Sequence, residues 1–152
     1  MRSSGLVKPI VIAEDNDDDY EVVYHALTDA GGPLREIIRC ENGQDLLDYL
    51  RGKGQFSTSE RSFPPAFIIL DLNLPGIDGR AVLQEIKSDR ILKKIPVVVM
   101  TVSNDQRDVE SCYEAGANTF IAKPIDWNEF FSTVARMKEY WLKVAILPEG
   151  DA

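Results

Sequence analysis

The chain has 152 residues, of which 44% are hydrophobic and 28% charged, and this composition predicts one globular domain and excludes bulk disorder. Its 17 basic and 25 acidic residues leave a net charge of −8, which argues against direct binding to DNA or to an anionic membrane. No apolar run approaches the roughly 18 residues that span a bilayer, and two distant cysteines without a CxxC motif favour the reducing cytoplasm over a disulfide framework or zinc site.

Five short apolar runs predict five β-strands. The central runs are rich in β-branched residues and nearly unbroken, as is typical of strands that lie buried on both faces of a parallel sheet. The runs cover residues 10–13, 37–40, 66–70, 96–100 and 119–122.

The segments between these runs carry the signals of helices. Apolar residues recur at helical spacing over 15–30, whose acidic turn at 17–19 is expected to face solvent, and Gly-Gly-Pro at 31–33 predicts its end. Asn42-Gly43 predicts a turn before a second helix, and the Gly-, Ser- and Pro-rich stretch 52–65 predicts a surface loop. The expected caps of the later helices are Asp78, Asn104 or Asp105, and Asp126, with Gly116 as a stop and an apolar seam from Phe130 to Trp141.

The alternation of strand and helix predicts a single α/β domain. Parallel strands need crossovers of about a dozen or more residues, which these gaps supply. Right-handed crossovers place helices on both faces of the sheet. In such a doubly wound sheet, ligands bind beyond the carboxyl ends of the strands.

Residues that carry chemistry follow four of the predicted strands. The first strand is followed by Glu14 and Asp15, and the third by Asp71. Thr101 ends the fourth strand, and Lys123 follows the fifth. Each residue alone is more simply explained as a helix cap or turn former. Suitable residues at four different strand ends make one shared site the better interpretation.

The expected cluster of carboxylates predicts a metal site. Like charges that lie close together resist ionisation, and a hard cation such as Mg²⁺ relieves the conflict. Asp15, Asp71 and a loop carbonyl are the expected ligands, with Glu14 reaching the ion through water. Asp71 would then attack a phosphoryl group, since aspartyl phosphates are recognised covalent intermediates. Lys123 would supply positive charge to the phosphoryl oxygens, and Thr101 a hydroxyl donor.

These residues resemble the receiver domain of two-component response regulators. The similarity rests on residues 12–16, 71–79, 101–103 and 123–124, and it extends from about 8 to 142. It implies a flavodoxin-like (βα)5 fold, a doubly wound five-stranded parallel sheet with strand order 2-1-3-4-5. It also implies that the protein accepts a phosphoryl group from a histidine kinase and acts through protein contacts.

The resemblance implies a role for each matching residue. Asp71 is the expected phosphoacceptor. Glu14 and Asp15 are the expected acidic pair for Mg²⁺, to which Asp71 adds its carboxylate and Asn73 its backbone carbonyl. Lys123 is the expected phosphate-binding lysine.

The resemblance also implies a conformational switch. Thr101 is expected to move toward the phosphoryl group, and Phe120 to fill the space that Thr101 leaves. The family usually has a small residue after the switch threonine, whereas this chain has Val102. We expect this bulkier side chain to restrict the entry of water and to slow dephosphorylation relative to Val102→Ala.

Two segments narrow the resemblance to the single-domain regulators that partner bacterial phytochromes, namely the loop 52–65 and the tail 140–148. They imply that a light-regulated histidine kinase of the bacteriophytochrome kind is the phosphodonor. The expected boundaries are 1–7 for an N-terminal extension, 8–142 for the receiver domain and 143–152 for a C-terminal tail. No residues remain for a DNA-binding output domain, so direct binding to DNA is not expected.

The C-terminal segment holds more large apolar side chains than one inward helical stripe accommodates. Aromatic residues are enriched in interface cores, which predicts a homodimer through the fourth helix, the fifth strand, the fifth helix and the tail. The alternative is that the tail packs on its own domain. The residues concerned are Trp127, Phe130, Phe131, Tyr140, Trp141, Leu142, Ile146 and Leu147.

Two other functions compete with a phosphoacceptor switch. A magnesium-dependent phosphatase with an aspartyl-phosphate intermediate, similar to the haloacid dehalogenases, would have a second Asp two residues after the nucleophile. This chain has Asn73 there, which predicts at most slow self-dephosphorylation rather than turnover. A flavodoxin-like cofactor binder would need a phosphate-cradling loop after the first strand, but the acids at 14–17 would repel phosphate unless a metal intervened.

Overall fold

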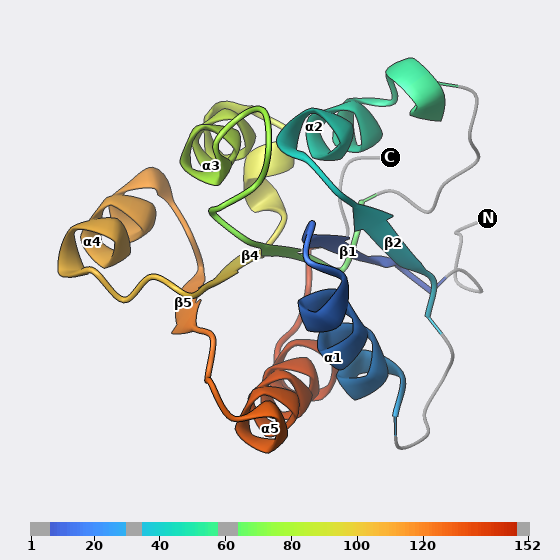
Figure 1. Cartoon of the computed structure of the whole chain (residues 1–152). Helices are drawn as coiled ribbons and strands as arrows, with labels where there is room; N and C mark the ends of the chain where they lie inside the picture. The colour runs from blue at the N-terminus through green and yellow to red at the C-terminus, as the bar shows by residue number, and fades with distance from the viewer. Residues whose placement is uncertain (1–6, 30–34, 58–63, 149–152) are drawn as a thin grey trace.

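The computed structural model describes residues 7–29, 35–57 and 64–148, which form a parallel sheet between two layers of helices (Figure 1). Its strands are β1 (Ile10–Ala13), β2 (Ile37–Cys40), β3 (Phe67–Leu70), β4 (Val97–Thr101) and β5 (Thr119–Ala122). Its helices are α1 (Asp17–Thr28), α2 (Gly43–Arg51), α3 (Gly79–Ser88), α4 (Gln106–Ala115) and α5 (Trp127–Glu139). The strand order is β2-β1-β3-β4-β5, so the predicted doubly wound fold is confirmed.

The burial of each strand follows its place in the sheet. Every residue of β1, β3 and β4 is buried, as the unbroken apolar runs predict for strands covered on both faces. The edge strands β2 and β5 are largely half-buried. The weaker apolar run at β2 therefore reflects its position at the edge of the sheet.

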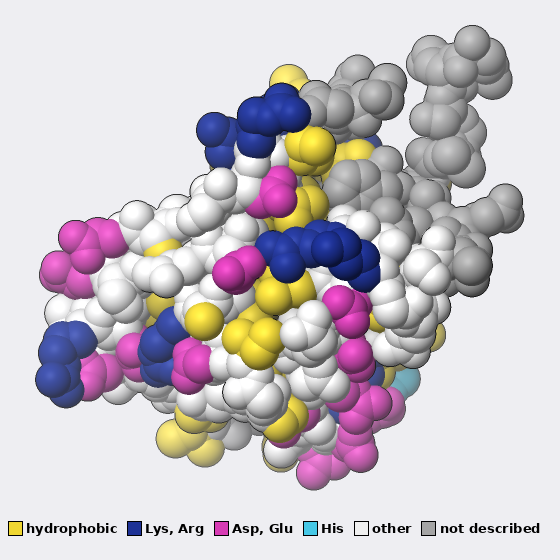
Figure 2. Space-filling view, turned by 90° about the horizontal axis from the view of Figure 1, so that it is seen from above, with side chains coloured by type: hydrophobic (Ala, Val, Ile, Leu, Met, Phe, Trp, Pro, Cys, Tyr) yellow, Lys and Arg dark blue, Asp and Glu magenta, His cyan; other side chains and the backbone are white. Residues whose placement is uncertain are grey.

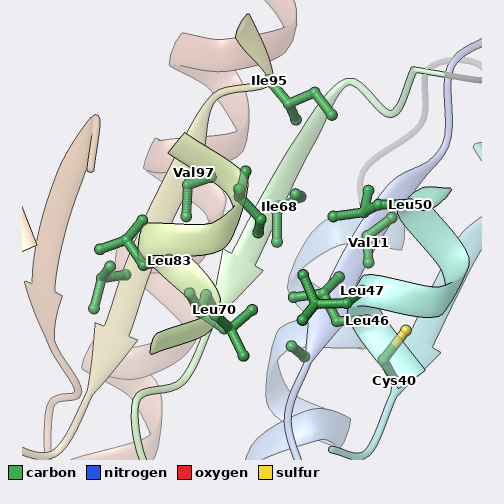
Figure 3. Close-up of a cluster of buried hydrophobic side chains, with 14 of the residues drawn as sticks. Val11, Cys40, Leu46, Leu47, Leu50, Ile68, Leu70, Leu83, Ile95 and Val97 are labelled. Carbon is green, nitrogen blue, oxygen red and sulfur yellow. The ribbon is translucent and has the colours of Figure 1, made fainter. Parts of the chain in front are cut away.

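Two hydrophobic cores lie on opposite faces of the sheet. The helices α1 and α5 cover one face, while α2, α3 and α4 cover the other (Figure 1). Figure 3 shows part of the second core, in which leucines of α2 and α3 point toward the strands. Its labelled residues include Leu46, Leu47, Leu50 and Leu83 over Val11, Ile68, Leu70 and Val97.

The helix α1 begins two residues later than predicted. Asn16 is its N-cap, because the Asn16 side chain accepts a hydrogen bond from the Asp19 N–H at 2.9 Å. The helix ends at Thr28, and the predicted stop signal at 31–33 lies outside the described residues.

The predicted caps of the later helices are confirmed. Asp78, Asp105 and Asp126 each accept a hydrogen bond from a backbone N–H of the first helical turn, and Asp105 rather than Asn104 caps α4. Gly116 follows α4 with a φ of 109°, a left-handed conformation that glycine adopts without strain.

Three predicted boundaries shift by a few residues. The strand β3 begins at Phe67 rather than at residue 66, and β4 begins at Val97 rather than at Pro96 and ends at Thr101 as expected. Pro96 has no N–H to donate to a sheet, whereas the Thr101 carbonyl accepts a hydrogen bond from the Lys123 N–H at 2.7 Å. The helix α5 ends at Glu139, and a π-helical turn follows it over Tyr140–Val144.

The C-terminal segment folds back onto its own domain. Trp141, Leu142 and Leu147 pack against the core under α1 and α5, and the Trp141 ring lies 6.5 Å from that of Phe67. Ile146 is 97% exposed, so the tail is only partly covered. The alternative prediction, that the tail packs on its own domain, therefore holds for part of it.

The loop after α2 is not purely a surface insertion. The Phe56 ring lies edge-on to Tyr49 at 5.2 Å and covers the core, while 58–63 fall outside the described residues.

Figure 2 looks onto the side that carries α2 and α3, where basic and acidic side chains are interspersed. Across the described residues, no helix has the length and apolar character needed to cross a membrane.

Candidate functional site

The register of the sheet brings the predicted site residues to one edge. Ala13 of β1 pairs with Leu70 of β3, so the next residues, Glu14 and Asp71, leave the sheet side by side. The Asp71 N–H donates to the Ala13 carbonyl at 3.1 Å and extends this pairing. The strand order reverses between β1 and β3, which is where doubly wound sheets bind ligands.

The carboxylates of Glu14, Asp15 and Asp71 form one cluster. Each offers an oxygen that lies within 4.8 Å of the others. Glu14 and Asp71 are 4% and 6% exposed, whereas Asp15 faces solvent. Carboxylate oxygens suit hard divalent cations, so the donor set fits the expected metal.

Lys123 reaches from the end of β5 into this acid cluster. Its ammonium group donates to Glu14 Oε1 at 2.7 Å, to Asp19 Oδ2 at 2.7 Å and to Asp71 Oδ2 at 2.9 Å. The Lys123 side chain is only 5% exposed. It therefore serves as the buried counter-ion that the neighbouring acids require.

The prediction that the whole acidic turn of α1 faces solvent is wrong for Asp19. Asp17 and Asp18 are exposed, but the Asp19 side chain turns inward to Lys123. Sequence reasoning missed this residue because acids in a first helical turn are well explained by the helix dipole. Nothing in the sequence pattern separates Asp19 from Asp17 and Asp18, because Asp15 lies before the Asn16 cap and shares no helix face with Asp19.

Burial and pairing set the charges of the site. Desolvation, reinforced by the neighbouring Asp71 carboxylate, raises the pKa of Glu14 to about 7 despite its bond to Lys123. Desolvation acts on Asp71 in the same direction, but hydrogen bonds from Lys123 and the Asn73 N–H outweigh it and lower the pKa of Asp71. Burial would lower the pKa of Lys123, but its three carboxylate partners raise it. Of the two buried acids, Asp71 is therefore the one whose charged form the site favours.

A backbone N–H of the turn after β3 binds the Asp71 side chain. The Asn73 N–H donates to Asp71 Oδ1 at 3.0 Å. Gly79, at the start of α3, donates its N–H to the Leu72 carbonyl at 3.0 Å. A Cβ at Gly79 would lie 2.6 Å from the Asp71 carbonyl oxygen, so only glycine permits this approach.

The expected switch residues Thr101 and Phe120 lie on the neighbouring strands β4 and β5. Thr101 is fully buried, and its hydroxyl lies 3.4 Å from Asn73 Nδ2. Phe120 is half-buried against the core under α4, and its N–H donates to the Tyr113 hydroxyl at 3.1 Å. Val102 is 69% exposed at the end of β4.

The family model of the response regulator receiver domain matches residues 10–135, so the chain belongs to this family. Among known proteins, it is 36% identical over 145 residues to the response regulator Rcp1 of Synechocystis. The match covers 95% of this chain and 96% of Rcp1.

Solved structures of three relatives resemble this fold over most of its length. The phosphorylated cyanobacterial phytochrome response regulator RcpA is 38% identical, with a TM-score of 0.87 over 94% of this chain and 99% of RcpA. The Mn²⁺-bound form of Rcp1 is 36% identical, with a TM-score of 0.86 over 93% of this chain and 99% of Rcp1. The bacteriophytochrome response regulator RtBRR is 35% identical, with a TM-score of 0.72 over 94% of this chain and 85% of RtBRR.

These findings identify the chain as a receiver domain of two-component signalling. They also disfavour the phosphatase alternative. The residue two positions after Asp71 is Asn73, whose amide faces the Thr101 hydroxyl and has no carboxylic proton to transfer. The acidic turn after β1 likewise differs from the phosphate-cradling loop of a cofactor binder.

Proposed function

We propose that Asp71 is the phosphoacceptor of a signalling switch. The observation that carries this proposal is the meeting of three carboxylates and one buried lysine at the carboxyl edge of the sheet. Hydrogen bonds from Lys123 and the Asn73 N–H lower the pKa of Asp71 and so favour its ionised, nucleophilic form. Lys123 lies 2.9 Å from Asp71 Oδ2, within reach of any phosphoryl group attached there.

The proposed reaction is a phosphoryl transfer from a kinase histidine. An Asp71 oxygen forms the new bond to phosphorus while the P–N bond breaks, and the imidazole leaves with a proton from solvent. Lys123 donates to the phosphoryl oxygens, and Thr101 moves to donate its hydroxyl. Phe120 then fills the space that Thr101 leaves.

We propose Mg²⁺ as the physiological ion, held by Asp15, Asp71 and the Asn73 carbonyl, with Glu14 reaching it through water. Bound Mg²⁺ supplies positive charge that offsets the carboxylates and the phosphoryl oxygens. The support is the set of oxygen donors together with a metal-bound form of the relative Rcp1. Mg²⁺ typically takes one or two carboxylates and keeps several waters, which suits a cluster open to solvent at Asp15.

We propose a phytochrome-linked histidine kinase as the partner and the cytoplasm as the location. The support for the kinase is the similarity to RcpA and RtBRR, which are described as phytochrome and bacteriophytochrome response regulators. The support for the cytoplasm is that Cys40 and Cys112 are both buried and free. The proposed output is protein contact, with no binding to DNA or membrane.

We also propose a homodimer formed by α4, β5, α5 and the tail. Although Trp141 packs inward, Tyr140, Val144 and Ile146 remain at least half exposed. Sedimentation of the full chain and of a chain that ends before Lys143 tests this proposal. A concentration-dependent dimer that the truncation weakens supports it, whereas monomers in both samples contradict it.

Incubation with a small phosphodonor and Mg²⁺ tests the switch against the phosphatase. We expect close to one equivalent of acid-stable, base-labile label per chain and no rapid release of phosphate. The Asp71→Asn variant should take up no label. Continuous release of phosphate by the wild-type protein would favour the phosphatase instead.

A further inference from the structure

A second cation, Arg39, supports the turn that carries the metal-binding acids. Arg39 lies on the edge strand β2 and reaches across to the turn between β1 and α1. Its Nε–H donates to the Glu14 carbonyl at 3.1 Å, and its Nη2 group donates to Asp17 Oδ1 at 2.8 Å. The Arg39 Cζ lies 4.4 Å from the ring centroid of Tyr20, so one guanidinium joins both ends of the turn to α1.

Arg39 and Lys123 differ in what they bind. The Lys123 ammonium group donates to three carboxylates. Two of them, Glu14 and Asp71, belong to the acid cluster that is expected to bind the metal. Arg39 bonds the Glu14 backbone and Asp17, neither of which offers an oxygen to that cluster. A bound cation would therefore compete with Lys123 for Glu14 and Asp71, and a phosphoryl group would compete for Lys123 itself, but both would leave the contacts of Arg39 in place.

The contacts of Arg39 depend on the planar shape of its guanidinium. Its side chain is 21% exposed, and its nitrogens bind two acceptors while its face lies over an aromatic ring. A lysine carries the same charge, but its ammonium group has neither the fork nor the flat face. Lysine at this position would preserve the electrostatic attraction and lose the geometry.

We propose that Arg39 is a positioning residue that holds Glu14 and Asp15 in their metal-binding arrangement. This inference rests on the proposed function, because it assumes that these acids bind a divalent cation. Groups that orient metal ligands from outside the coordination shell typically change metal affinity by roughly 10–100-fold when they are replaced. Arg39 acts in this way through the backbone of Glu14 and through the first turn of α1.

Mn²⁺ affinity, measured from the electron paramagnetic resonance signal of the free ion, tests the inference. We expect Arg39→Lys to weaken binding roughly tenfold although the net charge is unchanged. Arg51→Lys is the matched control for the loss of a guanidinium, since Arg51 lies in the last turn of α2, at the end opposite the site. Its affinity should equal that of the wild type.

Two acidic variants provide a matched pair at the surface. Asp17→Asn and Asp18→Asn remove the same charge from adjacent, exposed positions, but only Asp17 bonds Arg39. We expect roughly threefold weaker Mn²⁺ binding for Asp17→Asn and less than about a twofold change for Asp18→Asn, because exposed charges are screened. This pair tests the inference even where Arg39→Lys fails to fold.

The outcomes separate this inference from the proposed function. Absence of Mn²⁺ binding by the wild-type protein would overturn both. If the wild type binds Mn²⁺ and the affinity of Arg39→Lys lies within twofold of the wild-type affinity, the positioning role alone is overturned. Equal effects of Asp17→Asn and Asp18→Asn would do the same.

Discussion

Glu14 and Asp71 leave adjacent strands at the same level, yet their environments make them different acids. Both are buried, and both bond the ammonium group of Lys123. Asp71 also accepts the Asn73 N–H and its pKa is lowered, whereas the pKa of Glu14 is raised to about 7. The site thus separates a nucleophilic carboxylate from one whose charge is costly until a cation arrives.

The raised pKa of Glu14 predicts a pH-dependent stability of the metal-free protein. Because the folded state disfavours the charged form, the contribution of Glu14 to the free energy of unfolding is complete below about pH 4.5 and is lost as the pH rises through 7. In chelator, we expect the wild type to lose about 1–3 kcal/mol over this range relative to Glu14→Gln.

Urea unfolding of both proteins across this pH range measures the difference. The variant corrects for the titrating groups that Glu14 does not contact, because only Glu14 differs between the two chains. Mg²⁺ should restore the stability of the wild type above pH 7 and have little effect on Glu14→Gln. Parallel pH profiles in chelator would contradict the assignment.

We expect the side chain of Val102 to lengthen the lifetime of the phosphorylated state. Its side chain is 69% exposed next to Thr101, where it can cover a phosphoryl group on Asp71 from water. Val102→Ala should therefore lose label several-fold faster, because water is excluded less well. Ile125→Ala is the matched control, since Ile125 is 99% exposed just beyond Lys123 and Pro124. Equal or slower loss of label in Val102→Ala would reject the idea.

The roles of single residues were only partly predictable from sequence. Glu14, Asp15, Asp71 and Lys123 follow strands, and parallel strands end at one edge, so their meeting follows from topology. The inward turn of Asp19 depends on where Asn16 starts the helix, which periodicity alone does not resolve.

At the scale of elements, a salt bridge joins α3 to α4 beside the site. Arg80 donates two hydrogen bonds to Asp108, at 2.8 and 2.7 Å, and Ser103 donates to the same carboxylate at 2.7 Å. Ser103 lies two residues after Thr101, so the bridge anchors the segment that the switch would move. Movement of Thr101 must therefore proceed against this contact.

A double-mutant cycle measures the strength of this bridge. We expect a coupling of about 1 kcal/mol between Arg80→Gln and Asp108→Asn in urea unfolding, because the pairing is bidentate but Arg80 is 38% exposed. The pair Arg107 and Asp105 is the control, since Arg107 is 92% exposed. Its coupling should be near zero, and equal couplings in the two cycles would contradict a special role for the α3–α4 bridge.

Elements were predicted well where burial decides them. The apolar runs that form β1, β3 and β4 are buried on both faces of the sheet. Their sequences are therefore apolar without interruption, which indicates buried strands clearly. Boundaries were less predictable, because a cap or a missing N–H decides them, as Asn16 and Pro96 illustrate. The π-helical turn at Tyr140–Val144 has no sequence signal that we recognise.

At the scale of the whole molecule, the order of the strands brings the acids of the site together. The strands β1 and β3 diverge into opposite crossovers and leave their carboxyl ends free for Glu14 and Asp71. The helices α1 and α5 bury one face of the sheet while α2, α3 and α4 bury the other (Figure 1). The sheet places Glu14, Asp71 and Lys123 side by side, so we expect a change of charge on Asp71 to be relieved by neighbouring segments.

Mass-spectrometric mapping of the phosphorylated residue, in Mg²⁺ and in chelator, tests the central claim most directly. We predict an acyl phosphate on Asp71 alone, formed in Mg²⁺ and nearly abolished in chelator. Phosphorylation at another residue, or equal phosphorylation of Asp71 with and without the metal, would show that Asp71 is not a metal-dependent phosphoacceptor.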